Sequence, residues 1–240
     1  MIPHRLTFRR IVLSILLICS CSTIHGQKRK PPQGGRLAIV IDDRLAALRS
    51  TPQLSGSLIR RLGRGRLIAV RGKRLSKDGT AFVLVNVTSR THGWIQRDAL
   101  VSPSQPGDDR RLLSNIESSK DFERISLSRI FLDYFPRSRL RARVLLLIGD
   151  TAEEVAVKLS SNASKQFSKR INDVSEMSSY LNYSGLDRYN RQGVKFVFAA
   201  RSKRLHYDGW AWREILRRHR QSAELAEAQK RLEELESRMQ

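Results

Sequence analysis

Residues 36–103 constrain the fold most, because short apolar runs of strand length alternate there with turn sequences. The runs are Leu37–Ile41, Leu58–Leu62, Leu67–Val70 and Phe82–Val87, followed by Trp94-Ile95. No helical period separates them. Five or six short strands in about 70 residues are typical of a small β-barrel or sandwich.

The turns of this stretch contain glycine and aspartate. Asp78-Gly79 is a strong two-residue hairpin signal, since glycine tolerates positive φ. Gly63-Arg64-Gly65 predicts a hairpin-like break between the second and third runs. Thr91-His92-Gly93 predicts a further turn. Asp42-Asp43 is interpreted as a turn rather than a pair of catalytic carboxylates, because no acid–base partner lies near it in the sequence.

Three motifs in order carry a family resemblance: Ala47–Pro52, Leu62–Leu67, and Gly93-Trp94-Ile95 with Leu100. Together they resemble a bacterial SH3-like (SH3b) domain. The resemblance implies a small SH3-like β-barrel over residues 36–102 that binds a wall or protein ligand. Phe82 stands where the family often carries Trp or Tyr, so a less aromatic surface is expected. Trp94 is expected in the core, with an exposed ligand platform as the alternative.

The N-terminus has the three-part plan of a secretory signal, with arginines before the apolar run Ile11–Ile18. That run is too short for a stable membrane-spanning helix. Residues 1–20 are therefore predicted to be a signal peptide. Ile18–Cys21 resembles a bacterial lipobox, which implies lipidation of Cys21 and membrane anchoring in the periplasm. Cleavage nearer Gly26 is the alternative, and residues 21–35 are predicted to be a linker.

The second half of the chain has a helical period. Residues 103–120 are predicted to be a linker, because two prolines and a glycine follow the last strand, and residues 121–240 an α-helical domain. Apolar residues from Phe122 to Tyr134 recur at helical spacing until Pro136 ends the helix. A second helix is predicted from Ser138 through Leu159, in which Gly149 marks a turn or a close helix crossing.

Two helix junctions resemble each other. Ser138 with Ala142, and Ser222 with Ala226, each place a serine at a cap position and an alanine four residues later. This resembles the junctions of tetratricopeptide (TPR) proteins. The resemblance implies TPR-like helical hairpins that mediate protein interactions. The expected fold class is thus α+β and multidomain, a small SH3-like β-barrel followed by a TPR-like helical domain.

The C-terminal third adds smaller features. Val194–Ala199 and Arg204–Tyr207 predict a β-hairpin or an irregular lobe. His206 and Asp208 are interpreted as a hydrogen-bonded structural pair rather than a metal or catalytic fragment. Three apolar residues are expected to pack in the core, and residues 222–239 to form a charged helix with a Glu227/Arg231 pair. The three are Trp210, Trp212 and Ile215.

The formal charge of +22 is spread along the whole chain, and removing residues 1–20 leaves +19. Such a field attracts anionic polymers. No catalytic, cofactor or metal motif accompanies it, so no enzymatic activity and no cofactor are expected. The hypothesis is an exported, lipid-anchored envelope scaffold that binds a cell-wall polymer or an envelope protein. A basic protein that binds nucleic acid or another anionic polymer is the alternative, which the export signal disfavours.

Overall fold

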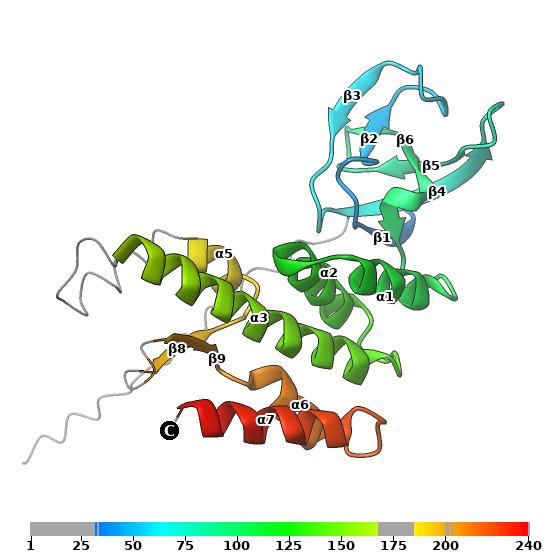
Figure 1. Ribbon diagram of the computed structural model, residues 1–240. Helices are drawn as coiled ribbons and strands as arrows, with labels where there is room; N and C mark the ends of the chain where they lie inside the picture. The colour runs from blue at the N-terminus through cyan, green and yellow to red at the C-terminus, as the bar shows by residue number, and fades with distance from the viewer. Residues whose placement is uncertain (1–31, 33, 168–184, 200–201, 203, 240) are drawn as a thin grey trace, which may run out of the picture. The chain divides into compact units, whose positions relative to one another are not determined.

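The computed structural model describes residues 32, 34–167, 185–199, 202 and 204–239 (Figure 1). The fold is α+β: a seven-stranded antiparallel sheet is followed by helices in the C-terminal half. Among the described residues, no helix is both long enough and apolar enough to cross a membrane.

The seven-stranded sheet, with its loops, makes up residues 34–102, which we call the β module. Its elements are β1 (Arg36–Val40), β2 (Ala47–Arg49), β3 (Leu58–Arg61), β4 (Leu67–Leu75), β5 (Ala81–Asn86), β6 (His92–Gln96), the 3-10 helix η1 (Arg97–Ala99) and β7 (Leu100–Val101). The strand order is β3-β2-β6-β5-β4-β1-β7, and every neighbouring pair is antiparallel.

One of the two predicted hairpins is confirmed. Asp78 and Gly79 turn β4 into β5, with Gly79 at φ 81° and the Asp78 carboxylate accepting the Thr80 N–H at 3.0 Å. The hairpin predicted at Gly63-Arg64-Gly65 is wrong, because β3 pairs with β2, whereas β4 pairs with β5 and β1. The Gly65 N–H donates to Val40 O at 2.8 Å, so this segment carries the chain across to β1.

The helices are α1 (Asp108–Ser118), α2 (Asp121–Tyr134), α3 (Arg141–Phe167), α5 (Asp187–Asn190), α6 (Trp210–Arg218) and α7 (Leu225–Met239). Strands β8 (Phe196–Ala199) and β9 (Arg204–Tyr207) form the antiparallel hairpin that was one of the two expectations for this segment. Helix α1 lies inside residues 103–120, which were expected to be a linker. Its Leu112 and Ile116 are fully buried, because they pack against the β module as well as the next helix.

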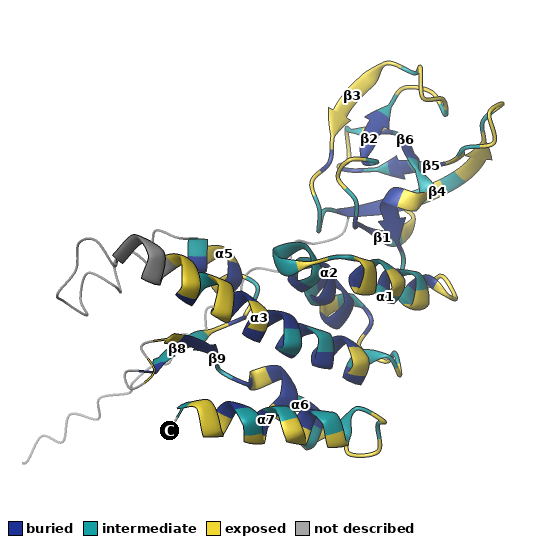
Figure 2. Ribbon diagram, in the orientation of Figure 1, coloured by how far each residue is buried: buried dark blue, intermediate teal, exposed yellow. Residues whose placement is uncertain are grey.

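Strand β1 contributes to two hydrophobic cores, and its last three residues, Ala38–Val40, are buried, as Figure 2 shows for most of the strand. Ala38 and Val40 belong to the core of the β module. Ile39 and the following Ile41 belong to the core that includes the helices. Because successive residues of a strand point to opposite faces, one strand joins the two layers.

A buried carboxylate reinforces this joint. Asp108, only 3% exposed, is the first residue of α1. Its carboxylate accepts hydrogen bonds from Arg97 at 2.7 Å and from the Ser102 N–H at 2.7 Å. Arg111 lies 3.3 Å from the same carboxylate. The negative charge of Asp108 at the N-terminus of α1 also interacts favourably with the helix dipole. The start of the helical region is thereby fixed to the end of the sheet.

Gly149 lies in the middle of α3, which continues through it without a turn. A Cβ atom at this position would overlap the indole ring of Trp212, which is 1% exposed. Of the two expectations for Gly149, the close helix crossing is the one observed, between α3 and α6. The core positions expected for Trp212 and Ile215 are confirmed, whereas Trp210 is 36% exposed.

We predict that Gly149→Ala destabilises the protein. At an exposed helix site the same change stabilises by up to about 1 kcal/mol, whereas overpacking costs about 1–3 kcal/mol. Urea unfolding of the wild type and the variant measures whether Gly149→Ala raises or lowers the free energy of unfolding. In a Trp212→Leu background, which removes the indole ring, Gly149→Ala should lower the free energy of unfolding much less. A stabilising Gly149→Ala would contradict this account of the crossing.

Candidate ligand-binding site

A cavity of about 640 Å³ opens at one end of the β module. Its apolar floor is the end of the module's core, formed by Ala38, Val83 and Leu100. Strands β1, β4, β5 and β7 supply the walls, and the chain beyond β7 adds polar atoms from Ser102 and Gln105. We call this cavity the basic groove. Concave, mostly apolar cavities with a few polar groups are common ligand sites.

Four cations line the basic groove and no carboxylate does. They are Arg36 on β1, Lys73 and Arg74 on β4, and Arg97 on η1. Arg97 is already engaged by Asp108. Arg36 and Lys73 are exposed and make no ion pair with any residue that the structure describes. The groove therefore presents positive charge beside apolar surface, which suits a ligand with carboxylate or phosphate groups and an apolar part.

Trp94 does not lie in the core, so the expectation of a core residue is wrong. Its side chain is half-buried, and the Arg74 guanidinium lies over the ring at 5.6 Å from the centroid. Trp94 pairs across the sheet with Arg49 and Leu84, whereas its neighbour Ile95 is fully buried in the core. The alternation of strand residues gives the inward position to Ile95 and leaves the larger ring on the outer face.

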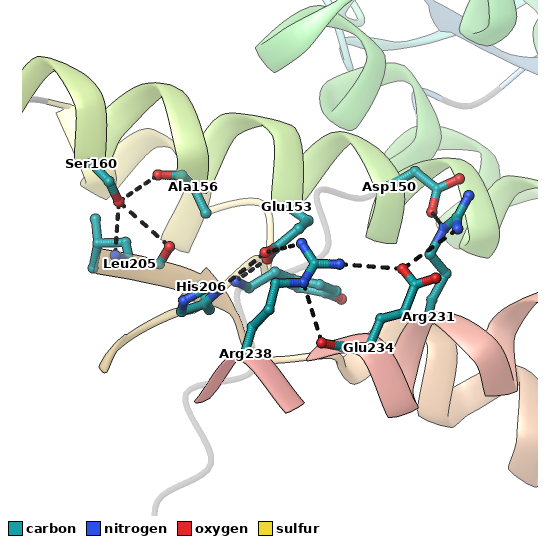
Figure 3. A network of polar contacts seen from close by, with 10 residues as sticks. Asp150, Glu153, Ala156, Ser160, Leu205, His206, Arg231, Glu234 and Arg238 are labelled. Atoms are coloured by element: carbon teal, nitrogen blue, oxygen red, sulfur yellow. Dashed lines mark hydrogen bonds and ion pairs between the residues drawn. The ribbon is translucent and has the colours of Figure 1, made fainter. Parts of the chain in front are cut away.

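A second polar site links β9, α3 and α7, and is drawn in Figure 3. Glu153 on α3, 8% exposed, accepts the Tyr207 N–H at 2.9 Å and lies 3.0 Å from the Nδ1 atom of His206. Arg238 of α7 reaches the same carboxylate at 3.4 Å. This cluster holds three elements together around one buried charge.

The structural pair expected for His206 is thus formed with Glu153 and not with Asp208. The Asp208 carboxylate instead accepts the Trp210 N–H at 3.0 Å, at the start of α6. His206 is 5% exposed, and its Nε2 atom has no hydrogen-bond partner among the described residues. Its buried position and its carboxylate partner make it a packing residue of the β8–β9 hairpin.

A neighbouring ion-pair group joins α3 to α7. Arg231 lies 3.1 Å from Asp150 and 2.8 Å from Glu227, which confirms the expected Glu227/Arg231 pair. Burial raises the pKa of Asp150, and the hydrogen bond from Arg231 opposes that rise. The group stabilises the packing of the last helix.

The remaining sequence candidates are placed as follows. Asp42 accepts hydrogen bonds from Arg44, which lowers the pKa of the aspartate, and this agrees with the expected turn. Cys21 lies outside the described residues. Within the described ranges, no group of three or more His, Cys, Asp or Glu side chains could hold a metal ion.

Comparison with known proteins gives no relative: no family model, no curated protein and no solved structure matches the chain.

The sequence interpretation missed the groove residues Arg36, Lys73, Arg74 and Arg97. A signal for the β4 wall of the groove was present, since residues 58–77 contain many arginines and lysines but no aspartate or glutamate. Such a run places cations on a strand with no local acid to neutralise them. The contribution of β1 and η1 depends on strand pairing between distant segments, which the run does not reveal.

We predict that Glu153→Ala lowers the free energy of unfolding by about 3 kcal/mol, because it leaves buried polar partners without their acceptor. Glu234→Ala is the matched control. Glu234 also pairs with Arg238, at 3.3 Å, but is more exposed, so its loss should cost under about 1 kcal/mol. Chemical denaturation of both variants tests this, and equal losses would contradict a special role for Glu153.

Proposed function

We propose that this chain is an exported, lipid-anchored scaffold protein of the bacterial cell envelope. Its β module binds an anionic cell-wall polymer in the basic groove, and its helical region holds a protein partner. The observation that carries the proposal is the groove itself, where four cations and no carboxylate surround an apolar floor. Wall peptides combine carboxylates with small apolar side chains, and both parts fit this lining.

The groove favours a wall polymer over nucleic acid, which is the alternative raised by the charge. Binding of single-stranded nucleic acid commonly uses aromatic rings on which bases stack. The aromatic residue in the groove lining, Phe82, is only 1% exposed. Trp94 does not line the groove, and the Arg74 guanidinium already lies over its ring. The groove therefore offers cations and an apolar floor but no exposed aromatic ring. These features suit a ligand whose carboxylates are attached to aliphatic groups.

Two observations support an SH3-like module. Gly93 begins the Gly-Trp-Ile motif in β6, and a Cβ atom there would lie 2.6 Å from Arg49 O, so the motif needs glycine where β2 approaches. Ile95, the third residue of the motif, is fully buried in the module's core. A small antiparallel sheet with a hydrophobic core of its own supports the SH3-like β-barrel that we propose.

The helical packing supports the TPR-like part of the proposal. Helix α2 packs on α3, α6 packs on α7, and α3 also packs on α6, so two helical hairpins are neighbours. Ala142, four residues after Ser138, is 1% exposed. The second junction differs, because Ala226 is exposed and the fully buried alanine of α7 is Ala228. Hairpins of this kind provide surfaces for protein partners.

The lipid anchor is tested at the cysteines. We expect radiolabelled palmitate to enter the wild type expressed in a bacterium and to be absent from Cys21→Ala. Cys19→Ala is the matched control and should keep the label, since the lipobox resemblance assigns the lipid to Cys21. Equal labelling of Cys21→Ala and wild type, or no label in either, would refute the anchor.

Wall binding is tested with charge reversals in the groove. Arg36→Glu/Lys73→Glu should weaken sedimentation of the mature protein with purified peptidoglycan at physiological salt by roughly tenfold or more, equivalent to about 1.4 kcal/mol. The two side chains are exposed, so folding should be unaffected.

The matched control is Lys77→Glu/Arg90→Glu, which makes the same charge change in exposed turns of the module outside the groove. It should retain most of the binding. Equal loss in both double variants would refute a groove site and indicate diffuse attraction. DNA binding with a steep salt dependence, unaccompanied by retention on peptidoglycan, would favour the nucleic-acid alternative.

A further inference from the structure

Strand β3 ends the sheet and is paired on one side only. Its neighbour in the sheet order is β2, and no strand in the described part of the chain lies on its other side. All four residues of β3 are exposed, as Figure 2 shows. The opposite end of the sheet differs, since β7 is buried and runs on toward α1. An unpaired edge presents backbone N–H and C=O groups that another strand can pair with.

The side chains at this edge are apolar as well as exposed. Leu58 is 52% exposed, Ile59 is 47% exposed, and Leu54 in the preceding loop is 47% exposed. Three of the seven large hydrophobic side chains that are exposed in the described residues thus lie within residues 54–59. Single exposed apolar residues are ordinary, whereas an edge strand that is both unpaired and apolar is a place where another strand can add.

Two arginines complete the strand and restrict what can pair with it. Arg60 and Arg61 are exposed, and neither forms an ion pair with a described residue. A second copy of β3 would bring four guanidinium groups to one edge and is disfavoured by repulsion. The N-terminal residues 1–31 contain no Asp or Glu, so they cannot neutralise the pair either. Charge complementarity therefore selects an acidic occupant.

We propose that β3 binds an extended acidic segment of a partner protein as an additional strand of the sheet. The partner's backbone pairs with the free edge of β3. Its carboxylates lie against Arg60 and Arg61, and its aliphatic side chains cover Leu58 and Ile59. This site is separate from the basic groove, because no residue of β3 lines that cavity.

The experiment uses the mature full-length chain and fluorescence anisotropy with a synthetic, end-blocked Glu/Val peptide of repeating Val-Val-Glu-Glu, so that each face of the added strand carries both residue types, as β3 does. We expect wild type to bind it and Arg60→Glu/Arg61→Glu to bind roughly tenfold more weakly or worse, a change of about 1.4 kcal/mol. The same variant should instead bind a Lys/Val peptide. Lys77→Glu/Arg90→Glu, with equal charge, should bind the Glu/Val peptide as wild type does. Hydrogen exchange of the residues 58–61 amides should slow on binding.

Backbone pairing is tested by N-methylating alternate residues of the Glu/Val peptide, which blocks strand addition without changing its charge. This peptide should bind at least roughly tenfold more weakly. Equal binding of the methylated peptide, or no binding of the parent at about 1 mM, overturns the proposal. Loss of peptide binding in Arg36→Glu/Lys73→Glu but not in Arg60→Glu/Arg61→Glu would assign the peptide to the groove and also overturn it. Failure of wall binding leaves each of these results interpretable, since they use a different ligand and different residues.

Discussion

The structure depends on one strand, β1, whose last three residues are buried between two layers. Strand β1 gives Ala38 and Val40 to the core of the β module and Ile39 to the core that contains the helices. Burial of an apolar strand alone would not fix the relative position of the two layers, because the hydrophobic effect is non-directional. Asp108 fixes the position of α1 relative to the sheet, since its carboxylate accepts directional hydrogen bonds from Arg97 and from the Ser102 N–H. A second contact, Arg64 to Glu123 at 2.6 Å, ties the β3–β4 connection to α2.

The charge of the chain is distributed unevenly around this framework. Acids are far fewer than cations, and many of them are used in structural pairs such as Arg97–Asp108, Arg64–Glu123 and Arg231–Asp150. Cations without an ion pair occur in both halves of the described chain, and on the β module they include Arg36 and Lys73 in the basic groove and Arg60 and Arg61 on β3. Pairing within the fold therefore decides where the net charge is available to ligands. Composition gives the magnitude of the charge but not its location.

The difference between local sequence signals and long-range pairing explains how far the sequence could predict the structure. Local signals succeeded: Asp78-Gly79 turns the chain, and the apolar period from Phe122 to Tyr134 matches α2. The Gly63–Gly65 prediction failed because β3 and β4 pair with strands that are not their neighbours in sequence. Residues 103–120 were predicted to be a linker because two prolines and a glycine follow the last strand, and the buried face of α1 is short, with Leu112 and Ile116 as its fully buried hydrophobic residues.

The sites were harder to predict than the elements. His206 and Glu153 lie 53 residues apart in the sequence and meet only because β9 packs on α3. The nearby Asp208 was a reasonable partner for His206, but it stabilises the start of α6 instead. The groove combines cations from β1, β4 and η1, and its residues are brought together by long-range pairing. A run of basic residues indicated excess charge, whereas the fold determined which cations share a cavity.

The two ends of the sheet show opposite solutions to the problem of unpaired strand edges. At one end, β7 is short and buried, and the chain continues into α1, fixed by Asp108. At the other end, β3 retains a free edge with apolar side chains, and its arginines discourage pairing with an identical strand. The contacts with the helices come from β1, β7 and the β3–β4 connection, and not from the free edge of β3 itself, so a strand added at that edge need not displace them. The lining of the groove includes residues of β1 and β7, whereas β3 lies at the far end of the strand order. The two proposed sites share no residue, so a polymer in the groove and a protein strand at β3 would not compete for the same side chains.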